Sequence, residues 1–241
     1  MNRDKIRLIA LDMDGTITQH RTPLEPANRA VLDKLAARYR LVMVGAGACR
    51  RIHNQLGGYP LDVIGNYGME MGEYDRAKGE LVIVESQSVT VEPQDVVRER
   101  VTRLRRELGF ERFAGDTVEF HASGMITFPL LGTKAAIQDK LAFDPDRSRR
   151  RPLYPIVREA FSQYTVFIGG SSSFDIVPRP FNKLYALERY CARQGIARDQ
   201  VVFFGDDYRE GGNDQQVYES DFLVVTVDDY RDFPRRAQEV L

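Results

Sequence analysis

The sequence of 241 residues lacks the features that mark several classes of protein. Its two cysteines, Cys49 and Cys191, are far apart, so we expect no disulfide framework and a reducing compartment. No apolar run reaches the roughly 18 residues that a transmembrane helix needs. The apolar stretch at the amino terminus is too short for a signal peptide and runs into acidic residues. We therefore expect a cytoplasmic protein with no membrane partner.

Net charge is almost absent as well. The formal charge is −1 at pH 7, so no overall field attracts nucleic acid or an anionic membrane. A basic cluster at Arg147, Arg149, Arg150 and Arg151 could contact phosphate. Such a run is more often a solvated loop, and no interleaved aromatic residues support base stacking. We expect no nucleic-acid partner.

The length allows one or two domains with a sizeable core, and hydrophobic patterning divides the chain. The first part alternates short apolar runs with helical periodicity, which predicts right-handed crossovers and a parallel sheet. The expected strands here are 6–11, 39–44 and 61–65, with 81–84 in a small hairpin, and the expected helices are 26–38 and 48–56.

The pattern changes near residue 87. Helical stripes alternate with paired strands joined at turn signals, which is typical of an α+β module with an antiparallel sheet. The expected helices are 93–108, 134–141 and 154–161, and the expected strands are 117–121, 125–130, 164–168 and 174–177. We interpret 87–178 as an inserted cap domain. Residues 1–86 and 179–241, with a helix at 183–194 and strands at 201–204 and 222–227, form the core.

The most informative stretch is Leu8–Thr18, which reads LIALDMDGTIT. A buried strand ends there on Asp12 and Asp14, at the edge where open α/β sheets bind ligands. Alternation points these two carboxylates the same way, and Gly15 allows a sharp turn. An isolated pattern of two aspartates one residue apart commonly lies in a solvated loop. The whole string from Leu8 to Thr18 is far more specific for a functional site.

A second strand repeats this arrangement. VVFF is followed by Asp206 and Asp207, with Asp214 shortly after. In a parallel sheet both strand ends lie on one edge. Clustered carboxylates repel one another and a phosphate dianion, and a hard divalent cation such as Mg²⁺ resolves that conflict. The sequence therefore predicts a magnesium site.

Two further features concern phosphate. Lys183 begins a helix, where backbone N–H groups and the helix dipole also favour an anion. The second strand ends in Gly45-Ala46-Gly47, which has no hydroxyl. Backbone N–H groups of that loop could hold phosphate, or the loop could be a tight strand-to-helix turn.

The motif DMDGTIT resembles the nucleophile motif of the haloacid dehalogenase superfamily of phosphotransferases. Over most of the chain the sequence is closest to the eukaryotic-type phosphomannomutases and related sugar phosphatases with an α+β cap. The segments that carry this likeness are FFGDDYREGGND, GGSSSFDIVPRPFNKLYAL and VEFHASGMITFPLLG. The resemblance implies a Rossmann-like core with the cap inserted, a small phosphate ester as substrate, and the formation of a homodimer through the cap as one option.

The resemblance also implies roles for the acidic residues and Lys183. Asp12 would be the nucleophile that forms an aspartyl-phosphate, and Asp14 would be the general acid and base. Lys183 would pair with the transferring phosphate. The Mg²⁺ ligands would be Asp12, the main-chain carbonyl of Asp14, Asp206 and Asp214.

Other residues match substrate-binding positions of the mutases. Arg21, Ser173 and Asp175 would contact the sugar phosphate and its hydroxyls, although Ser173 and Asp175 could be a polar strand end. Gly45 and Ala46 would hold the phosphate.

Three cap positions depart from the mutases, which use arginines there to hold a second phosphate. This chain has His121, Thr133 and Lys140 instead. Lys140 could replace one arginine, Thr133 could not, and His121 could be structural. We therefore expect water to be the acceptor and predict a Mg²⁺-dependent phosphatase of a sugar phosphate. The alternatives are a phosphomannomutase or other phosphohexomutase, and a non-catalytic sugar-phosphate-binding protein.

Overall fold

A seven-stranded sheet forms the centre of the first of two units in the structure, a computed structural model that describes residues 3–241. The strand order is β11-β10-β1-β2-β3-β4-β5. The strands are β1 (Leu8–Leu11), β2 (Arg40–Val44), β3 (Asp62–Gly65), β4 (Glu70–Asp75), β5 (Glu80–Ser86), β10 (Val201–Gly205) and β11 (Leu223–Thr226). All pair in parallel except β4 and β5, which add an antiparallel hairpin to one edge. The sheet is therefore mixed, and the expected small hairpin is part of it.

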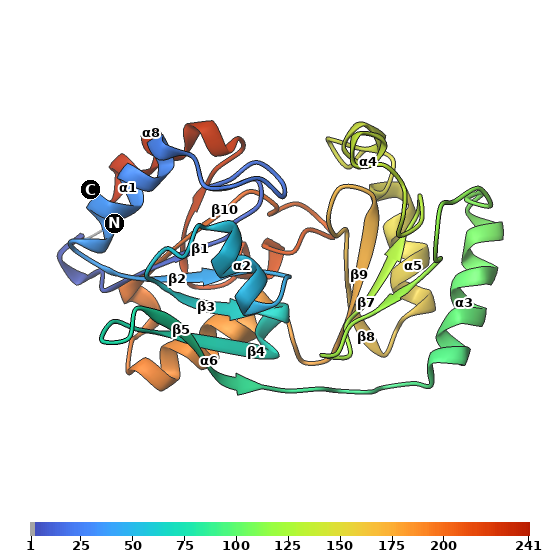
Figure 1. Cartoon of the computed structure of the whole chain (residues 1–241), viewed down its shortest axis with the longest axis horizontal. Helices are drawn as coiled ribbons and strands as arrows, with labels where there is room; N and C mark the ends of the chain where they lie inside the picture. Colours follow the sequence, from blue (N-terminus) through green and yellow to red (C-terminus); the bar gives the residue numbers. More distant parts are fainter. Residues whose placement is uncertain (1–2) are drawn as a thin grey trace. The chain divides into compact units, whose positions relative to one another are not determined.

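Both faces of the parallel strands are buried, which explains why these strands are continuously apolar. In β1, Ile9 and Leu11 belong to one hydrophobic cluster, whereas Leu8 and Ala10 belong to the other. The helices on the first face are α1 (Pro26–Ala36), α2 (Cys49–Gln55) and α8 (Phe233–Arg236), and those on the second are α6 (Lys183–Gln194) and α7 (Gln215–Tyr218). Figure 1 shows α1 and α6 on opposite sides of this sheet.

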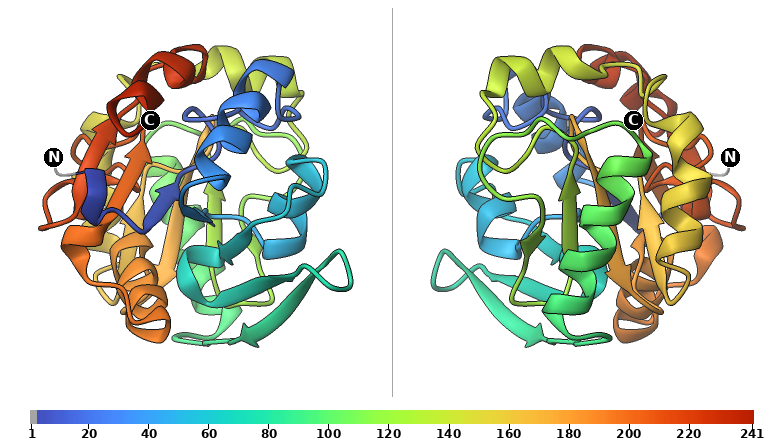
Figure 2. Two further views of the ribbon diagram at one scale, coloured as in Figure 1. Left: turned by 90° about the vertical axis from the view of Figure 1, so that its left-hand side faces the viewer. Right: turned by 90° about the vertical axis from the view of Figure 1, so that its right-hand side faces the viewer.

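The second unit is built on a four-stranded antiparallel sheet with the order β6-β7-β9-β8. Its strands are β6 (Glu119–Phe120), β7 (Ile126–Pro129), β8 (Tyr164–Phe167) and β9 (Ser173–Pro178). Its helices are α3 (Gln94–Glu107), α4 (Ile137–Phe143) and α5 (Tyr154–Ala160). Side chains of α3 and α5 pack with alternate strand residues in one core, and both helices cover the same face of the sheet (Figure 2).

The divisions between the units lie close to the expected domain boundaries. The first unit contains residues 3–87, Asn182–Arg209 and Asp214–Leu241, and the second contains Ser88–Phe181 with Glu210–Asn213. The expected second boundary, at 178/179, is slightly early, and the short segment Glu210–Asn213 packs with the cap unit. One reason is a hydrogen bond of 2.8 Å from the Ile168 N–H to the Gly211 carbonyl.

The basic cluster is not uniformly solvated. Arg149 is exposed, whereas Arg150 is only 1% exposed. The burial of Arg150 shows that the interpretation of this run as a solvated loop is wrong. A run of basic residues in the sequence does not reveal that one of them has a buried carboxylate partner. Elsewhere in the described chain, no helix is long and apolar enough to cross a membrane.

Candidate active site

The carboxyl end of β1 places Asp12 in a buried position. Met13 packs into the core at 2% exposure, and the Asp12 side chain lies beside α6, where its Oδ1 is 2.5 Å from Lys183 Nζ. The other carboxylate oxygen of Asp12 accepts a hydrogen bond from the Thr16 hydroxyl at 3.2 Å. Thr16 is fully buried and its hydroxyl also lies 3.3 Å from Asp206 Oδ1. It is a site residue that we did not single out, although it belongs to the DMDGT string.

Lys183 is the only fully buried lysine among the described residues, and the start of α6 explains its position. The Asn182 side chain caps the helix by accepting a hydrogen bond from Tyr185 N at 2.8 Å, which makes Lys183 the first helical residue. Its ammonium group lies 2.5 Å from Asp12 and 2.7 Å from Asp214. Burial opposes its charge, but the two carboxylates outweigh burial and hold the pKa of Lys183 above its ordinary value.

The end of β10 brings the other acids to the same place. Asp214 is 1% exposed, and its Oδ2 accepts hydrogen bonds from the N–H groups of Asp206 and Asp207 at 3.2 and 3.0 Å. Two glycines provide the necessary space. A Cβ atom on Gly15 would lie 2.7 Å from the Asp206 carboxylate, and one on Gly205 would lie 2.6 Å from Asp214. Gly15 also has a φ of +101°, which side chains rarely allow.

Three of these carboxylates form a group suited to a cation. One oxygen from each of Asp12, Asp206 and Asp214 lies within 4.8 Å of the others. Asp12 and Asp214 are buried and Asp206 is half-buried. Lys183 compensates one of the three negative charges of the ionised carboxylates, so a net negative charge is left. A hard divalent cation with oxygen ligands, such as Mg²⁺, fits this donor set. The carboxylate of Asp14 is not part of the group.

Asp14 has different partners. Its Oδ1 accepts hydrogen bonds from the Gln55 side chain at 2.8 Å and from the Arg21 N–H at 2.9 Å. The Thr18 hydroxyl lies 3.4 Å from the same oxygen. Gln55, from the end of α2, is another contact that the sequence motifs did not indicate. The Arg21 side chain is exposed, and Arg21 bonds to Asp14 through its main-chain N–H.

The glycine loop after β2 differs from the expectation in one respect. The Gly45 N–H donates to the Ile64 carbonyl at 2.9 Å, so it continues the sheet and is not available to a phosphate. The Ala46 N–H has no hydrogen-bond partner within residues 3–241. Of the two residues that we predicted to hold phosphate, Ala46 is therefore the one with a free donor.

Several polar side chains of the cap unit lie on the face of the sheet opposite α3 and α5. Phe174 and Ile176 of β9 enter the cap core, so Ser173 and Asp175 lie on that opposite face, where Asp175 is only 7% exposed. Asp175 pairs in register with Thr127, whose hydroxyl lies 2.9 Å from His121 Nε2. Three predicted substrate residues of the cap, namely His121, Ser173 and Asp175, thus share one face.

The other two cap positions bond to each other. Lys140 Nζ donates to the Thr133 carbonyl at 2.9 Å, and the Thr133 hydroxyl accepts a hydrogen bond from the Asp116 N–H at 2.9 Å. Lys140 is half-buried. His121, Thr133 and Lys140 have no guanidinium group, and Lys140 and Thr133 are already bonded to other groups of the cap.

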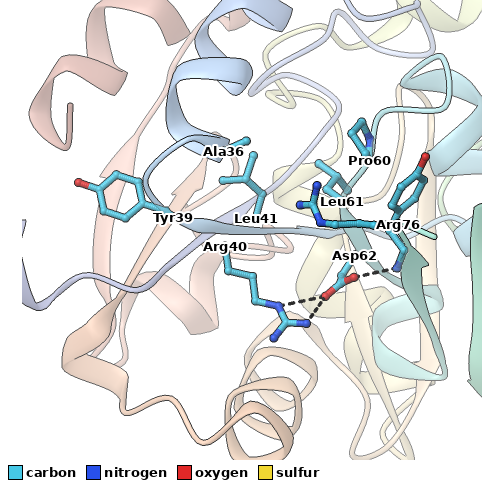
Figure 3. Close-up of a pocket in the computed structure, with 9 residues that line it drawn as sticks. Ala36, Tyr39, Arg40, Leu41, Pro60, Leu61, Asp62 and Arg76 are labelled. Atoms are coloured by element: carbon cyan, nitrogen blue, oxygen red, sulfur yellow. Dashed lines mark hydrogen bonds and ion pairs between the residues drawn. The ribbon is translucent and has the colours of Figure 1, made fainter. Parts of the chain in front are cut away.

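A cavity of about 310 Å³ lies at the opposite edge of the core sheet, where β2 and β3 begin (Figure 3). Arg40 and Asp62 line it and form an ion pair of 3.1 Å. Asp62 also accepts a hydrogen bond from the buried Tyr190 hydroxyl at 2.6 Å. Because parallel strands end at the other edge, this cavity is separate from the carboxylate group.

Comparison with known proteins finds relatives in sequence and in fold. A family model described as eukaryotic phosphomannomutase matches residues 28–241. The phosphomannomutase of Encephalitozoon cuniculi (strain GB-M1) is 24% identical over an alignment of 250 residues, covering 100% of this chain and 96% of that protein. The phosphomannomutase of Triticum aestivum is 28% identical over 228 residues, covering 90% of this chain and 88% of that protein.

Solved structures with low sequence identity share the fold. An N-terminally truncated IMP-nucleotidase from Plasmodium falciparum has a TM-score of 0.70 at 14% identity, covering 99% of this chain and 71% of that chain. A haloacid dehalogenase-like hydrolase from B. subtilis has a TM-score of 0.63 at 14% identity, covering 98% of this chain and 100% of that chain. The predicted core with an inserted α+β cap is therefore confirmed.

Proposed function

The chain belongs to the eukaryotic phosphomannomutase family of the haloacid dehalogenase superfamily, and from this premise we propose that it transfers a phosphoryl group of a hexose phosphate by way of Asp12. The observation that carries the proposal is the buried Lys183 ammonium group, 2.5 Å from Asp12 and 2.7 Å from Asp214. A buried cation beside a carboxylate at a strand end is suited to hold an incoming phosphate dianion.

In the proposed reaction an Asp12 carboxylate oxygen attacks phosphorus, and the bond from phosphorus to the sugar oxygen breaks. Asp14, as the carboxylic acid, gives its proton to that leaving oxygen. In the second half-reaction Asp14 takes the proton of the acceptor hydroxyl. The acceptor oxygen attacks the phosphorus, and the acyl phosphate bond breaks to restore the Asp12 carboxylate.

Mg²⁺ fits the site because the three carboxylates supply hard oxygen ligands and keep an excess of negative charge. Asp12, Asp206 and Asp214 would hold it, and when bound it would neutralise charge on the transferring phosphate. Other groups of the chain hold the carboxylates in place. Lys183 orients the Asp12 carboxylate, and the Asp206 and Asp207 N–H groups fix Asp214.

We propose that the acceptor is the free 6-hydroxyl of a hexose 1-phosphate, which attacks a phosphoryl group that Asp12 has first taken from a hexose bisphosphate. The new bisphosphate then gives its 1-phosphate to Asp12, so that the net reaction is isomerisation of a hexose phosphate. The supporting argument is the family: relatives named phosphomannomutase align over nine-tenths or more of the chain. This reverses the preference for hydrolysis that we derived from the cap positions alone.

Hydrolysis stays the second candidate because of a specific observation in the cap. A mutase must hold a second phosphate, and arginine binds phosphate better than lysine does because it does so bidentately. His121 bonds to Thr127, and the Lys140 ammonium group bonds to the Thr133 carbonyl. These contacts leave the three positions with less capacity for a second phosphate.

The test is incubation of mannose 1-phosphate with Mg²⁺ and a catalytic amount of a hexose bisphosphate, followed by ³¹P NMR. Formation of the 6-phosphate without inorganic phosphate supports the mutase. Release of inorganic phosphate as the main product would refute the mutase and would show that the protein is a phosphatase. The Asp12→Asn variant is the control for either reaction.

A non-catalytic binding protein would give neither product. It would also fail to form a beryllium fluoride adduct at Asp12, which mimics an aspartyl-phosphate. Absence of both products and of the adduct would overturn the proposed phosphoryl transfer altogether.

A further inference from the structure

The second unit contains a buried guanidinium group that the proposed chemistry does not use. Arg150 is 1% exposed, whereas its neighbour Arg149 is exposed. Burial of a charge is costly unless the charge is paired and hydrogen-bonded. The position of this side chain therefore depends on its partners.

Asp144 holds one end of the Arg150 side chain. Its Oδ2 accepts hydrogen bonds from Arg150 Nε at 2.7 Å and from the Arg150 N–H at 3.1 Å. Its Oδ1 accepts the Arg149 N–H at 2.8 Å. The Asp144 side chain is fully buried. The pair balances the charge and fixes the direction of the guanidinium plane.

The other end of the Arg150 side chain donates hydrogen bonds to carbonyl groups of one short segment, residues 169–173, here called the Gly169 loop. Arg150 Nη1 lies 2.7 Å from the Gly169 carbonyl, 3.1 Å from that of Gly170 and 2.9 Å from that of Ser173. Gly169 is buried, and a buried carbonyl group of an irregular segment needs partners. The guanidinium group therefore ties the two ends of this loop together.

The Gly169 loop supports two predicted sugar-binding side chains. The Ser173 hydroxyl donates to the Gly169 carbonyl at 3.0 Å, the same oxygen that Arg150 binds. A Cβ atom on Gly169 would lie 2.3 Å from Asp175 Cγ, so the Asp175 carboxylate rests against this glycine. A displacement of Gly169 would move both side chains.

We propose that Arg150 is a positioning residue for sugar recognition, which sets Ser173 and Asp175 through the Gly169 loop without touching the substrate. This inference rests on the proposed hexose phosphate substrate. Lysine cannot replace Arg150, because a single ammonium group cannot bind Asp144 and reach three carbonyl groups in the geometry of a planar fork.

The experiment compares Arg150→Lys with the matched control Arg149→Lys, the same change at the exposed neighbour. Isothermal titration calorimetry with Mg²⁺ present measures the affinity for mannose 1-phosphate and, separately, for inorganic phosphate, which has no sugar hydroxyls. We expect Arg150→Lys to bind mannose 1-phosphate about 10- to 100-fold more weakly, as small misplacements of binding groups do. Its affinity for inorganic phosphate, and both affinities of Arg149→Lys, should stay at wild-type values.

Hydrogen exchange at the amides of residues 169–173 supplies a second readout, with faster exchange expected in Arg150→Lys only. If Arg150→Lys does not fold, Asp144→Asn keeps the side-chain volume, removes the charge partner, and should give a smaller loss of the same kind. An unchanged affinity for mannose 1-phosphate in the folded variants would overturn the proposal, even with a lower melting temperature.

The outcomes separate this inference from the proposed function. A wild-type protein that binds mannose 1-phosphate but never converts it refutes the phosphoryl transfer, and the variant affinities still decide the role of Arg150. A wild-type protein that binds inorganic phosphate but no hexose phosphate overturns the positioning role.

Discussion

Replacement of Lys183 by methionine perturbs the centre of the candidate site with little change in side-chain volume. The wild-type ammonium group is fully buried and pairs with Asp12 and Asp214 at 2.5 and 2.7 Å. The Lys183→Met variant keeps the apolar contacts of α6 but leaves two buried carboxylates without their shared cation. We expect the variant to be less stable and nearly inactive.

The size of the effect follows from this burial. Removal of one partner from a buried ion pair costs about 3–5 kcal/mol, because the remaining charge is desolvated and uncompensated. For a protein of this length such a loss lowers the melting temperature by roughly 6–20 °C. Loss of the charge beside the transferring phosphate should lower turnover by about 100-fold or more.

Differential scanning calorimetry in EDTA measures the stability effect without a bound cation. Lys34→Met, at an exposed lysine on α1, is the matched control and should melt within about 2 °C of the wild type, as surface substitutions generally do. Addition of Mg²⁺ should raise the melting temperature of Lys183→Met more than that of the wild type, because its uncompensated carboxylates bind a cation more tightly.

One result would refute this reasoning. If Lys183→Met has the same melting temperature as the wild type in EDTA, the buried carboxylates do not need the charge of Lys183. The electrostatic description of the site would then be wrong.

Other predictions concern the same unit. Asp12→Asn should abolish turnover, because an amide is a far poorer nucleophile than a carboxylate; substantial residual activity would exclude the covalent mechanism. Gly15→Ala should cost about 1–3 kcal/mol from its φ of +101° and should weaken Mg²⁺ binding, because the new Cβ meets the Asp206 carboxylate; calorimetric titration of Mg²⁺ tests this. Burial raises the pKa of both thiols, to about 11 for Cys191, so Cys49 and Cys191 should react slowly with Ellman's reagent at pH 8 and rapidly after unfolding. Fast reaction of the native protein would contradict their burial.

The element pattern of the core was predictable because its signals are local. Apolar runs bounded by glycine or acidic residues identified the parallel strands, and α6 runs from Lys183 to Gln194 as expected. The antiparallel pairing of β4 with β3 was not predictable in the same way. Pairing joins segments through backbone hydrogen bonds, which do not depend on side-chain identity.

The cap shows the same limit more strongly. Its helices and hairpins were visible as periodicity, but the burial of Arg150 was not, because the run from Arg147 to Arg151 is uniformly basic. Only the folded chain brings Asp144 and the Gly169 carbonyl to opposite ends of that one side chain.

The sequence by itself determined which side chains make up the candidate site: a carboxylate at the end of a buried strand, further acids after a second strand, and a lysine at a helix start. Such residues can be recognised because each motif is contiguous and parallel strands share one carboxyl edge. The tertiary structure decided which groups are committed to structural bonds. It gives the Gly45 N–H to the sheet and the Arg150 guanidinium group to the Gly169 loop. These assignments depend on distances between segments far apart in the chain, and a linear pattern does not contain them.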